Sequence, residues 1–234
     1  MHQLTIAMPD GPAPAYLWDR PGPPVLALMD GLGMRPAIRE VGAQIASAGY
    51  RVLMPDLFYR LGAYTPPEPR ALFADPAVLK AWFARVSPVA TGEALLGDLA
   101  VYLDVIGGTK VGAVGYCMGG RLAVVAAAHF PTRVAAAAAY HPGGLVTDKP
   151  DSPHLLAPRI RAHLYLGRAQ DDTNFDDAHH ATLAAALTAA RVDHQIDPRP
   201  ARHGWVPSDT PVHDPAEAAH HLVTLDALFR ATLT

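Results

Sequence analysis

Residues 111–121 read VGAVGYCMGGR, a stretch that joins a predicted strand, a tight turn and the start of a predicted helix. Residues 111–114 form an uninterrupted apolar run, which is typical of a strand buried on both faces of a parallel sheet. The alanine-rich residues 121–129 predict a helix. Cys117 lies in the turn between them, with one glycine two positions before it and another two positions after it. This spacing is typical of a strained turn that exposes a nucleophilic side chain at the carboxyl end of a sheet.

The rest of the chain alternates between strand and helix patterns. Apolar runs predict further strands over residues 25–29, 50–54, 134–140, 162–166 and 193–197. The spacing of apolar residues predicts helices over residues 36–48, 178–190 and 215–233. Such alternation implies right-handed crossovers and an α/β fold, in which one mostly parallel sheet carries helices on both faces.

The whole chain, residues 1–234, is expected to form a single domain, because one α/β domain extends to about 250 residues. Residues 57–105 interrupt the alternation with a turn-rich, aromatic stretch and two predicted helices, over residues 76–84 and 91–103. We expect this helical insertion to border a pocket.

The composition is that of a soluble globular protein. Half of the residues are hydrophobic, 18% are charged, and the net charge is −3. These values exclude a basic nucleic-acid-binding surface and a disordered chain. No run approaches the roughly 18 apolar residues of a membrane span, and the first ten residues lack the basic-then-apolar order of a secretory signal. We therefore expect a cytoplasmic protein with no nucleic-acid or membrane partner.

Cys117 is the only cysteine, which excludes an internal disulfide and a zinc site of clustered thiolates. A lone cysteine is either a small core residue or a reactive thiol. The strand, the glycine spacing and the helix favour the nucleophile, and the helix N-terminus favours the thiolate. Paired histidines at 179–180 and 220–221 lack the i, i+4 spacing of helical zinc ligands, so no metal site is predicted.

The partners of such a nucleophile follow it in the order acid, then histidine. Among the twelve histidines, His203 lies late in the chain on a predicted loop after the last strand, and we predict that it is the base. The acid is expected on the loop after the strand at 162–166, where Asp171 and Asp172 are adjacent. Adjacent side chains point apart, so only one is expected to reach the imidazole. We favour Asp172, with Asp171 as the alternative.

An oxyanion would need two backbone N–H donors. One is predicted at Met118, after the nucleophile, and the other at Gly31 or Leu32, after the early strand. Asp30 on the same loop either directs its carboxylate at Cys117 or serves as a turn residue.

With these residues identified, the chain resembles the dienelactone hydrolase family from about Pro24 to Phe229. The strongest match is GYCMGGR at 115–121, and PDLF at 55–58, GDL at 97–99 and ARHG at 201–204 support it. The resemblance implies the α/β-hydrolase fold and a Cys117–His203–Asp172 triad. It also implies hydrolysis of a small ester or lactone through an acyl-thiol intermediate, with no cofactor.

Two departures from the family concern the resting thiol and the substrate. In the family an acidic residue contacts the resting thiol until substrate displaces it. Asp30 matches that residue, but Met29-Asp30 stands where the family typically has His-Glu. Family enzymes also bind a substrate carboxylate with an arginine four residues after the histidine, where this chain has Pro207. The residues expected to contact substrate instead are Tyr64, Trp82 and Arg121.

Two functional hypotheses follow. The first is a monomeric hydrolase of a small ester or lactone. The alternative is a catalytically silent binding protein with the α/β-hydrolase fold, which would explain Met29-Asp30, the missing arginine and the ambiguous aspartate.

Overall fold

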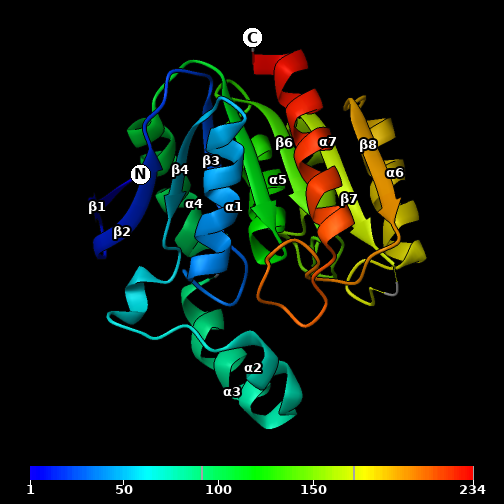
Figure 1. The fold of residues 1–234 in the computed structure, drawn as a ribbon. Helices are drawn as coiled ribbons and strands as arrows, with labels where there is room; N and C mark the ends of the chain where they lie inside the picture. Colours follow the sequence, from blue (N-terminus) through cyan, green and yellow to red (C-terminus); the bar gives the residue numbers. More distant parts are fainter. Residues whose placement is uncertain (91, 171, 234) are drawn as a thin grey trace.

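The computed structural model describes residues 1–90, 92–170 and 172–233, and of residues 92–94 the backbone only. In this described part, eight strands form one sheet in the order β1-β2-β4-β3-β5-β6-β7-β8 (Figure 1). From β4 to β8 all neighbours are parallel, whereas β2 pairs antiparallel with both β1 and β4. The strands are β1 (His2–Met8), β2 (Gly11–Trp18), β3 (Pro24–Leu28), β4 (Arg51–Pro55), β5 (Val111–Tyr116), β6 (Val134–Tyr140), β7 (His163–Ala169) and β8 (His194–Arg199).

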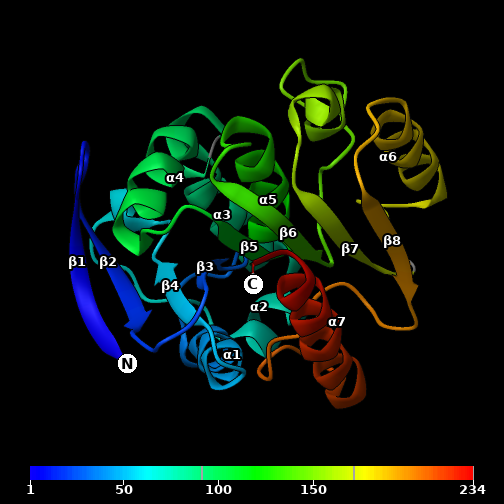
Figure 2. The same cartoon turned by 90° about the horizontal axis from the view of Figure 1, so that it is seen from above.

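Helices cover both faces of the sheet (Figure 2). One face carries α1 (Pro36–Ser47) and α7 (Pro215–Leu233), and the other carries α4 (Gly92–Ile106), α5 (Met118–His129) and α6 (Asp177–Ala189). The expected mostly parallel α/β architecture is therefore confirmed. Among the described residues, every helix is too short or too polar to cross a bilayer.

The turn from β5 to α5 requires its glycines. A Cβ on Gly115 would lie 1.9 Å from the Gly119 carbonyl oxygen, and a Cβ on Gly119 would lie 2.2 Å from the Leu28 carbonyl oxygen. The first approach packs the helix onto its own strand, and the second packs it onto the end of β3. Cys117 between them has φ 52° and ψ −113°, in the region that side chains rarely adopt. The predicted strained turn is confirmed.

The centre of the sheet is packed with small side chains. All six residues of β5 are buried, as are Ala136 to Ala139 of β6. Alanines on β6 let α5 approach one face and α7 the other. This close packing fixes the carboxyl ends of β3, β5 and β6 side by side, with Leu28 opposite Gly115 and Tyr116 opposite Tyr140.

The insertion between β4 and α4 extends beyond the carboxyl ends of the strands, at the bottom of Figure 1. It contains α2 (Pro69–Ala74) and α3 (Pro76–Val86), with the short 3₁₀ turns η1 (Tyr59–Leu61) and η2 (Ser87–Val89) on either side. Carboxylates of Glu68 and Asp75 cap the two helices, and each helix has proline at its first position. A third 3₁₀ segment, η3 (Pro153–Arg159), follows β6.

Candidate active site

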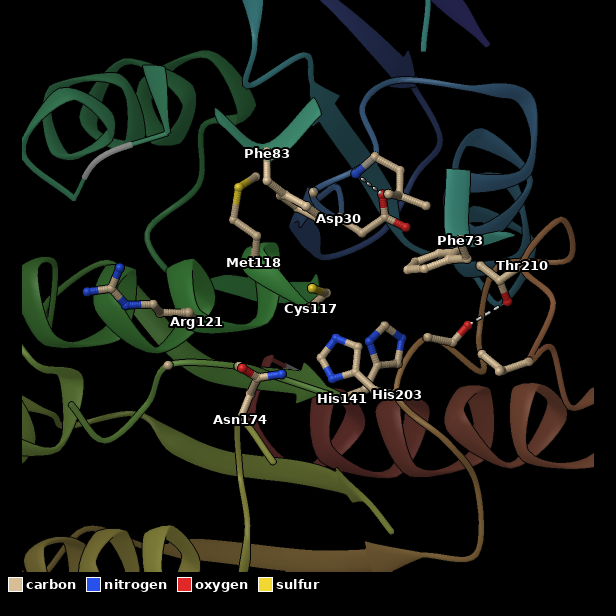
Figure 3. Close-up of a pocket in the computed structure, with 16 residues that line it drawn as sticks. Asp30, Phe73, Phe83, Cys117, Met118, Arg121, His141, Asn174, His203 and Thr210 are labelled. Atoms are coloured by element: carbon tan, nitrogen blue, oxygen red, sulfur yellow. Dashed lines mark hydrogen bonds between the residues drawn. The ribbon is translucent and has the colours of Figure 1, made fainter. Parts of the chain in front are cut away.

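A cavity of about 510 Å³ opens at the carboxyl end of the sheet (Figure 3). Its walls are largely apolar, and side chains from the strand ends, from α5 and from the insertion form them. The lining residues are Asp30, Gly31, Leu32, Phe73, Phe83, Cys117, Met118, Arg121, His141, Gly143, Gly144, Asn174, His203, Gly204, Thr210 and Val212.

Cys117 lines this cavity and is the residue directly before α5. Its backbone N–H donates to the Tyr140 carbonyl at 3.0 Å, and its own carbonyl accepts from Gly120 and Arg121 in the first turn of the helix. The backbone is therefore held from both sides, which keeps the side chain directed into the cavity. The thiol is partly exposed to solvent.

The predicted base and acid lie within hydrogen-bond distance. His203 Nδ1 and Asp172 Oδ2 are 2.6 Å apart, and Asp172 Oδ1 accepts from the Asn174 N–H at 2.9 Å. The Asp172 carboxylate is only 2% exposed. Burial raises the pKa of Asp172, but the hydrogen bond and charge of His203 and the Asn174 N–H outweigh it, so the pKa is lowered. Asp171, the alternative acid, lies outside the described residues.

His203 is coupled to the thiol as well as to the acid. Burial lowers its pKa, but the charge of Cys117, the Asp172 hydrogen bond and the hydrogen bond to Cys117 raise it to about 10 overall. The imidazolium is thus the favoured form when the sulfur carries a negative charge. Cys117, His203 and Asp172 are brought together from three separate loops, in the order that the sequence predicted.

Backbone donors are available on two sides of the sulfur. Met118 begins α5, and Gly31 lies on the loop after β3; both line the cavity. The Leu32 N–H already donates to Asp30 Oδ1 at 3.0 Å, whereas the Gly31 N–H has no partner among the described residues. The Gly31 carbonyl accepts from the Trp82 indole N–H at 2.9 Å, which fixes the orientation of the loop. Gly31 is therefore a better candidate donor than Leu32.

The model of the dienelactone hydrolase family matches residues 12–233. The chain belongs to this family. A protein of Escherichia coli K12, provisionally named a carboxymethylenebutenolidase, is 29% identical over 184 residues, which cover 76% of this chain and 65% of that protein. The carboxymethylenebutenolidase of Rhodococcus opacus is 30% identical over 115 residues, 49% of this chain and 42% of that protein. The chain thus matches less than two-thirds of the length of these relatives.

Solved structures of the family share the fold over the whole chain. A provisionally named dienelactone hydrolase of Klebsiella pneumoniae superposes with a TM-score of 0.84 at 21% identity, covering 98% of this chain and 97% of that one. The dienelactone hydrolase of Anabaena variabilis gives a TM-score of 0.64 at 19% identity, covering 100% and 98%. The α/β-hydrolase fold expected from the sequence is confirmed.

This family member holds Asp30 differently from the expected thiol contact. The carboxylate lines the cavity, but Arg35 donates to Oδ1 at 2.6 Å and to Oδ2 at 2.9 Å. No hydrogen bond joins Asp30 to Cys117 in the part of the chain that the structure describes. An ion pair within one loop stands in place of the expected contact.

Two of the three residues expected to contact substrate lie behind the wall of the cavity. The Tyr64 hydroxyl donates to Asp56 at 2.9 Å and accepts from the Met34 N–H at 3.0 Å. Trp82 donates to the Gly31 carbonyl, as described above, and is 7% exposed. Both side chains therefore support the loop that carries Gly31. Arg121 does line the cavity, with its guanidinium 3.6 Å from the Asp151 carboxylate.

His141 is a lining residue that the sequence did not single out. It follows β6 with φ 41° and is 1% exposed, and neither ring nitrogen has a partner among the described residues. Its ring packs edge-on against His203 at 5.2 Å and against Trp205 at 4.9 Å. Burial and the neighbouring His203 hold the pKa of His141 well below its usual range, so the ring is neutral. It forms an uncharged support for the His203 imidazole.

Phe73 and Phe83 were also not predicted, although both line the cavity from the insertion. Apolar residues on exposed helices are a weak signal, because most of them face the core. No three His, Cys, Asp or Glu side chains converge in a metal-binding arrangement within residues 1–90, 92–170 and 172–233.

Proposed function

We propose that this chain hydrolyses a small carboxylic ester or lactone through a Cys117–His203–Asp172 triad. The observation that carries the proposal is the placement of Cys117. It occupies a positive-φ turn inside the cavity, and its sulfur is coupled to an imidazole that a buried carboxylate holds. A core cysteine would need neither the strained backbone nor these partners.

Acylation requires that the thiol proton lies on His203 Nε2, since Nδ1 is bonded to Asp172. The thiolate attacks the carbonyl carbon, a C–S bond forms, and the carbonyl π electrons move to oxygen. The N–H groups of Gly31 and Met118 are the proposed donors to this oxyanion. When the C–O bond to the leaving group breaks, His203 transfers its proton to the departing oxygen.

Deacylation uses the same imidazole in its other protonation state. In the thioester the sulfur is uncharged, so neither the charge of Cys117 nor its hydrogen bond raises the pKa of His203, while burial still lowers that pKa and Asp172 still raises it. The pKa of His203 is therefore lower than in the resting protein. A neutral imidazole can then take a proton from water, whose oxygen attacks the thioester carbon. The C–S bond breaks, the carboxylic acid leaves, and the Cys117–His203 pair returns to its starting state with the proton that His203 took from water.

The cavity favours a substrate with an apolar body. Its walls are largely apolar, and the lining side chains include Leu32, Phe73, Phe83, Met118 and Val212. At about 510 Å³ it is large enough for a small acyl group together with its leaving group. The relatives' name carboxymethylenebutenolidase places lactones among the substrates to test first.

Turnover of p-nitrophenyl acetate, p-nitrophenyl butyrate and an unsaturated γ-lactone tests the proposal. Cys117→Ala should lower kcat/KM at least about a thousand-fold, because the nucleophile is removed. His220→Ala is a matched control, since that side chain is 39% exposed on α7 and outside the cavity. Full activity in the Cys117 variant would exclude the mechanism. Absence of turnover in the wild-type chain would favour the binding-protein alternative.

A further inference from the structure

Arg35 lies between two carboxylates that come from opposite ends of the chain. Its Nη1 and Nη2 donate to Asp30, and its Nε and Nη2 donate to Asp209 at 2.7 and 3.1 Å. The Arg35 side chain is 4% exposed and Asp30 is 6% exposed, whereas Asp209 is 29% exposed and meets solvent. Both pairs are bidentate, the strongest geometry for a guanidinium and a carboxylate. Arg35 is therefore held rigidly.

These three residues connect the two loops that carry the proposed chemistry. Asp30 and Arg35 lie on the loop between β3 and α1, residues 29–35, which also carries Gly31, the candidate oxyanion donor. This segment is called the oxyanion loop below. Asp209 lies on the loop between β8 and α7, residues 200–214, which also carries His203 and is called the histidine loop below. The neighbouring Thr210 hydroxyl donates to the Gly204 carbonyl at 2.8 Å. A movement of the histidine loop away from the oxyanion loop would have to break the Arg35 pairs.

Few charged or titratable groups face the sulfur. Among the described lining residues they are Asp30 from the loop after β3, Arg121 from α5, His141 after β6 and His203 after β8. Arg121 cannot accept a proton, and buried His141 strongly favours its neutral form. Asp30 and His203 therefore remain as acceptors for the thiol proton. Both Asp30 oxygens already accept from Arg35, and Oδ1 also accepts from the Leu32 N–H.

We propose that Arg35 is a positioning residue that neutralises the Asp30 carboxylate and ties the oxyanion loop to the histidine loop, so that the Cys117 proton passes to His203 in the resting protein. The proposal rests on the proposed function, in which Cys117 is the nucleophile. The proton moves from Sγ to Nε2 of His203, which yields a thiolate and an imidazolium without substrate. The thiol is therefore reactive before any ester binds.

Iodoacetamide alkylation of Cys117, followed by mass spectrometry at pH 7 without substrate, tests this directly. Arg35→Gln should slow alkylation about tenfold or more, because an unneutralised carboxylate beside the sulfur disfavours the thiolate. Arg35→Lys keeps the charge but not the bidentate geometry and should fall in between. The double variant Asp30→Asn/Arg35→Gln should return to within about threefold of wild type, since the opposing charge is gone.

Arg51→Gln is the matched control, because Arg51 also bonds an aspartate, Asp19, but lies at the amino end of β4, away from the cavity. It should alkylate at the wild-type rate. If Arg35→Gln does not fold, Arg35→Lys and Asp30→Asn/Arg35→Lys give the same comparison, and the double variant should be the faster. Wild-type alkylation in both single Arg35 variants would overturn the proposal. So would double variants as slow as the single ones, because a purely structural role gives that result.

Ester turnover separates this proposal from the proposed function. If Cys117→Ala abolishes turnover but Arg35 variants alkylate normally, the hydrolase mechanism stands and the role of Arg35 is wrong. If no ester or lactone is turned over while the Arg35 series behaves as predicted, Arg35 controls the thiol of a protein that is not this hydrolase.

Discussion

At the scale of single residues, Asp172 determines which nitrogen of His203 carries a proton. Its buried carboxylate accepts from Nδ1, which leaves Nε2 for the sulfur and for water. An aspartate in this position also stabilises the imidazolium that forms in both half-reactions. In the proposed mechanism the 2.6 Å contact therefore serves acylation and deacylation alike.

Asp172→Asn should lower kcat/KM by about 10² to 10⁴-fold, because an amide neither fixes the tautomer nor stabilises the imidazolium. Initial rates with p-nitrophenyl acetate measure this effect. Asp176→Asn is the control: Asp176 caps α6 on the surface, and asparagine caps a helix equally well. Equal losses in the two variants would show that the Asp172 effect is structural.

The sequence predicted that Cys117, His203 and Asp172 lie together, because chain order and loop position restrict the choice of partners strongly. It did not predict that Arg35 joins Asp30 to Asp209, because Asp209 is 174 residues from Arg35 in the chain. Charge pairing across such a distance depends on how loops meet at the sheet edge. The sequence also failed to predict that Tyr64 and Trp82 lie outside the cavity. A pattern of aromatic residues does not show whether a side chain lines a cavity or packs behind the residues that line it.

At the scale of elements, the turn between β5 and α5 tolerates no added side chain. Gly115→Ala should leave little soluble, folded protein, because its Cβ would overlap the Gly119 carbonyl at 1.9 Å. Gly97→Ala is the matched control within α4, since no atom lies within 4 Å of its added Cβ. That change should raise the free energy of unfolding by up to about 1 kcal/mol. Urea unfolding of both variants tests the comparison; a well-folded Gly115→Ala protein would contradict it.

The insertion helices should determine which acyl groups bind. Phe73 on α2 and Phe83 on α3 are 46% and 37% exposed and line the cavity. Phe73→Ser or Phe83→Ser should raise KM for p-nitrophenyl butyrate about five- to tenfold, from the loss of about 1 kcal/mol of apolar contact, with a smaller change for the acetate. Val78→Ser, on an exposed α3 residue outside the cavity, should leave both KM values unchanged. A uniform effect on both esters would argue against acyl selection.

Parallel strands buried on both faces were predictable from their continuous apolar runs, and β6 matches its predicted bounds, residues 134–140. The β1–β2 hairpin was not predicted. Pro12 and Pro14 lie in β2, and prolines argue against a strand because they donate no ladder hydrogen bond. Pairing with β1 on one side and β4 on the other overrides that local preference.

At the scale of the whole molecule, buried neutral histidines should limit stability in acid. Burial lowers the pKa of His221 to about 4, and it lowers the pKa of His141 as well. Between about pH 6.5 and pH 4 the unfolded chain therefore binds protons that the folded chain does not. The free energy of unfolding should fall by about 1.4 kcal/mol per pH unit for each such residue as the pH decreases through this window.

Urea unfolding at pH 7, 6 and 5 checks this slope. His221→Gln should reduce it by about 1.4 kcal/mol per pH unit, because one depressed group is removed. His220→Gln changes the adjacent, exposed imidazole, whose charge is a lesser cause of the lowered pKa of His221, and should reduce the slope by much less than His221→Gln. Identical slopes in all three proteins would mean that His221 does not control acid stability.

The insertion described above has a consequence for how such proteins diversify. Residues 69–86 roof the cavity yet belong to no layer of the sheet and its covering helices. Among the described residues, the insertion helices make one hydrogen bond to the loop that carries Gly31, from the Trp82 indole N–H to the Gly31 carbonyl. Recombination that exchanged this roof would alter substrate preference and spare the triad, provided that the incoming segment kept a donor for the Gly31 carbonyl. The site thus consists of two nearly separable parts, the packed strand ends that carry Cys117 and a cover that meets the Gly31 loop through one described hydrogen bond.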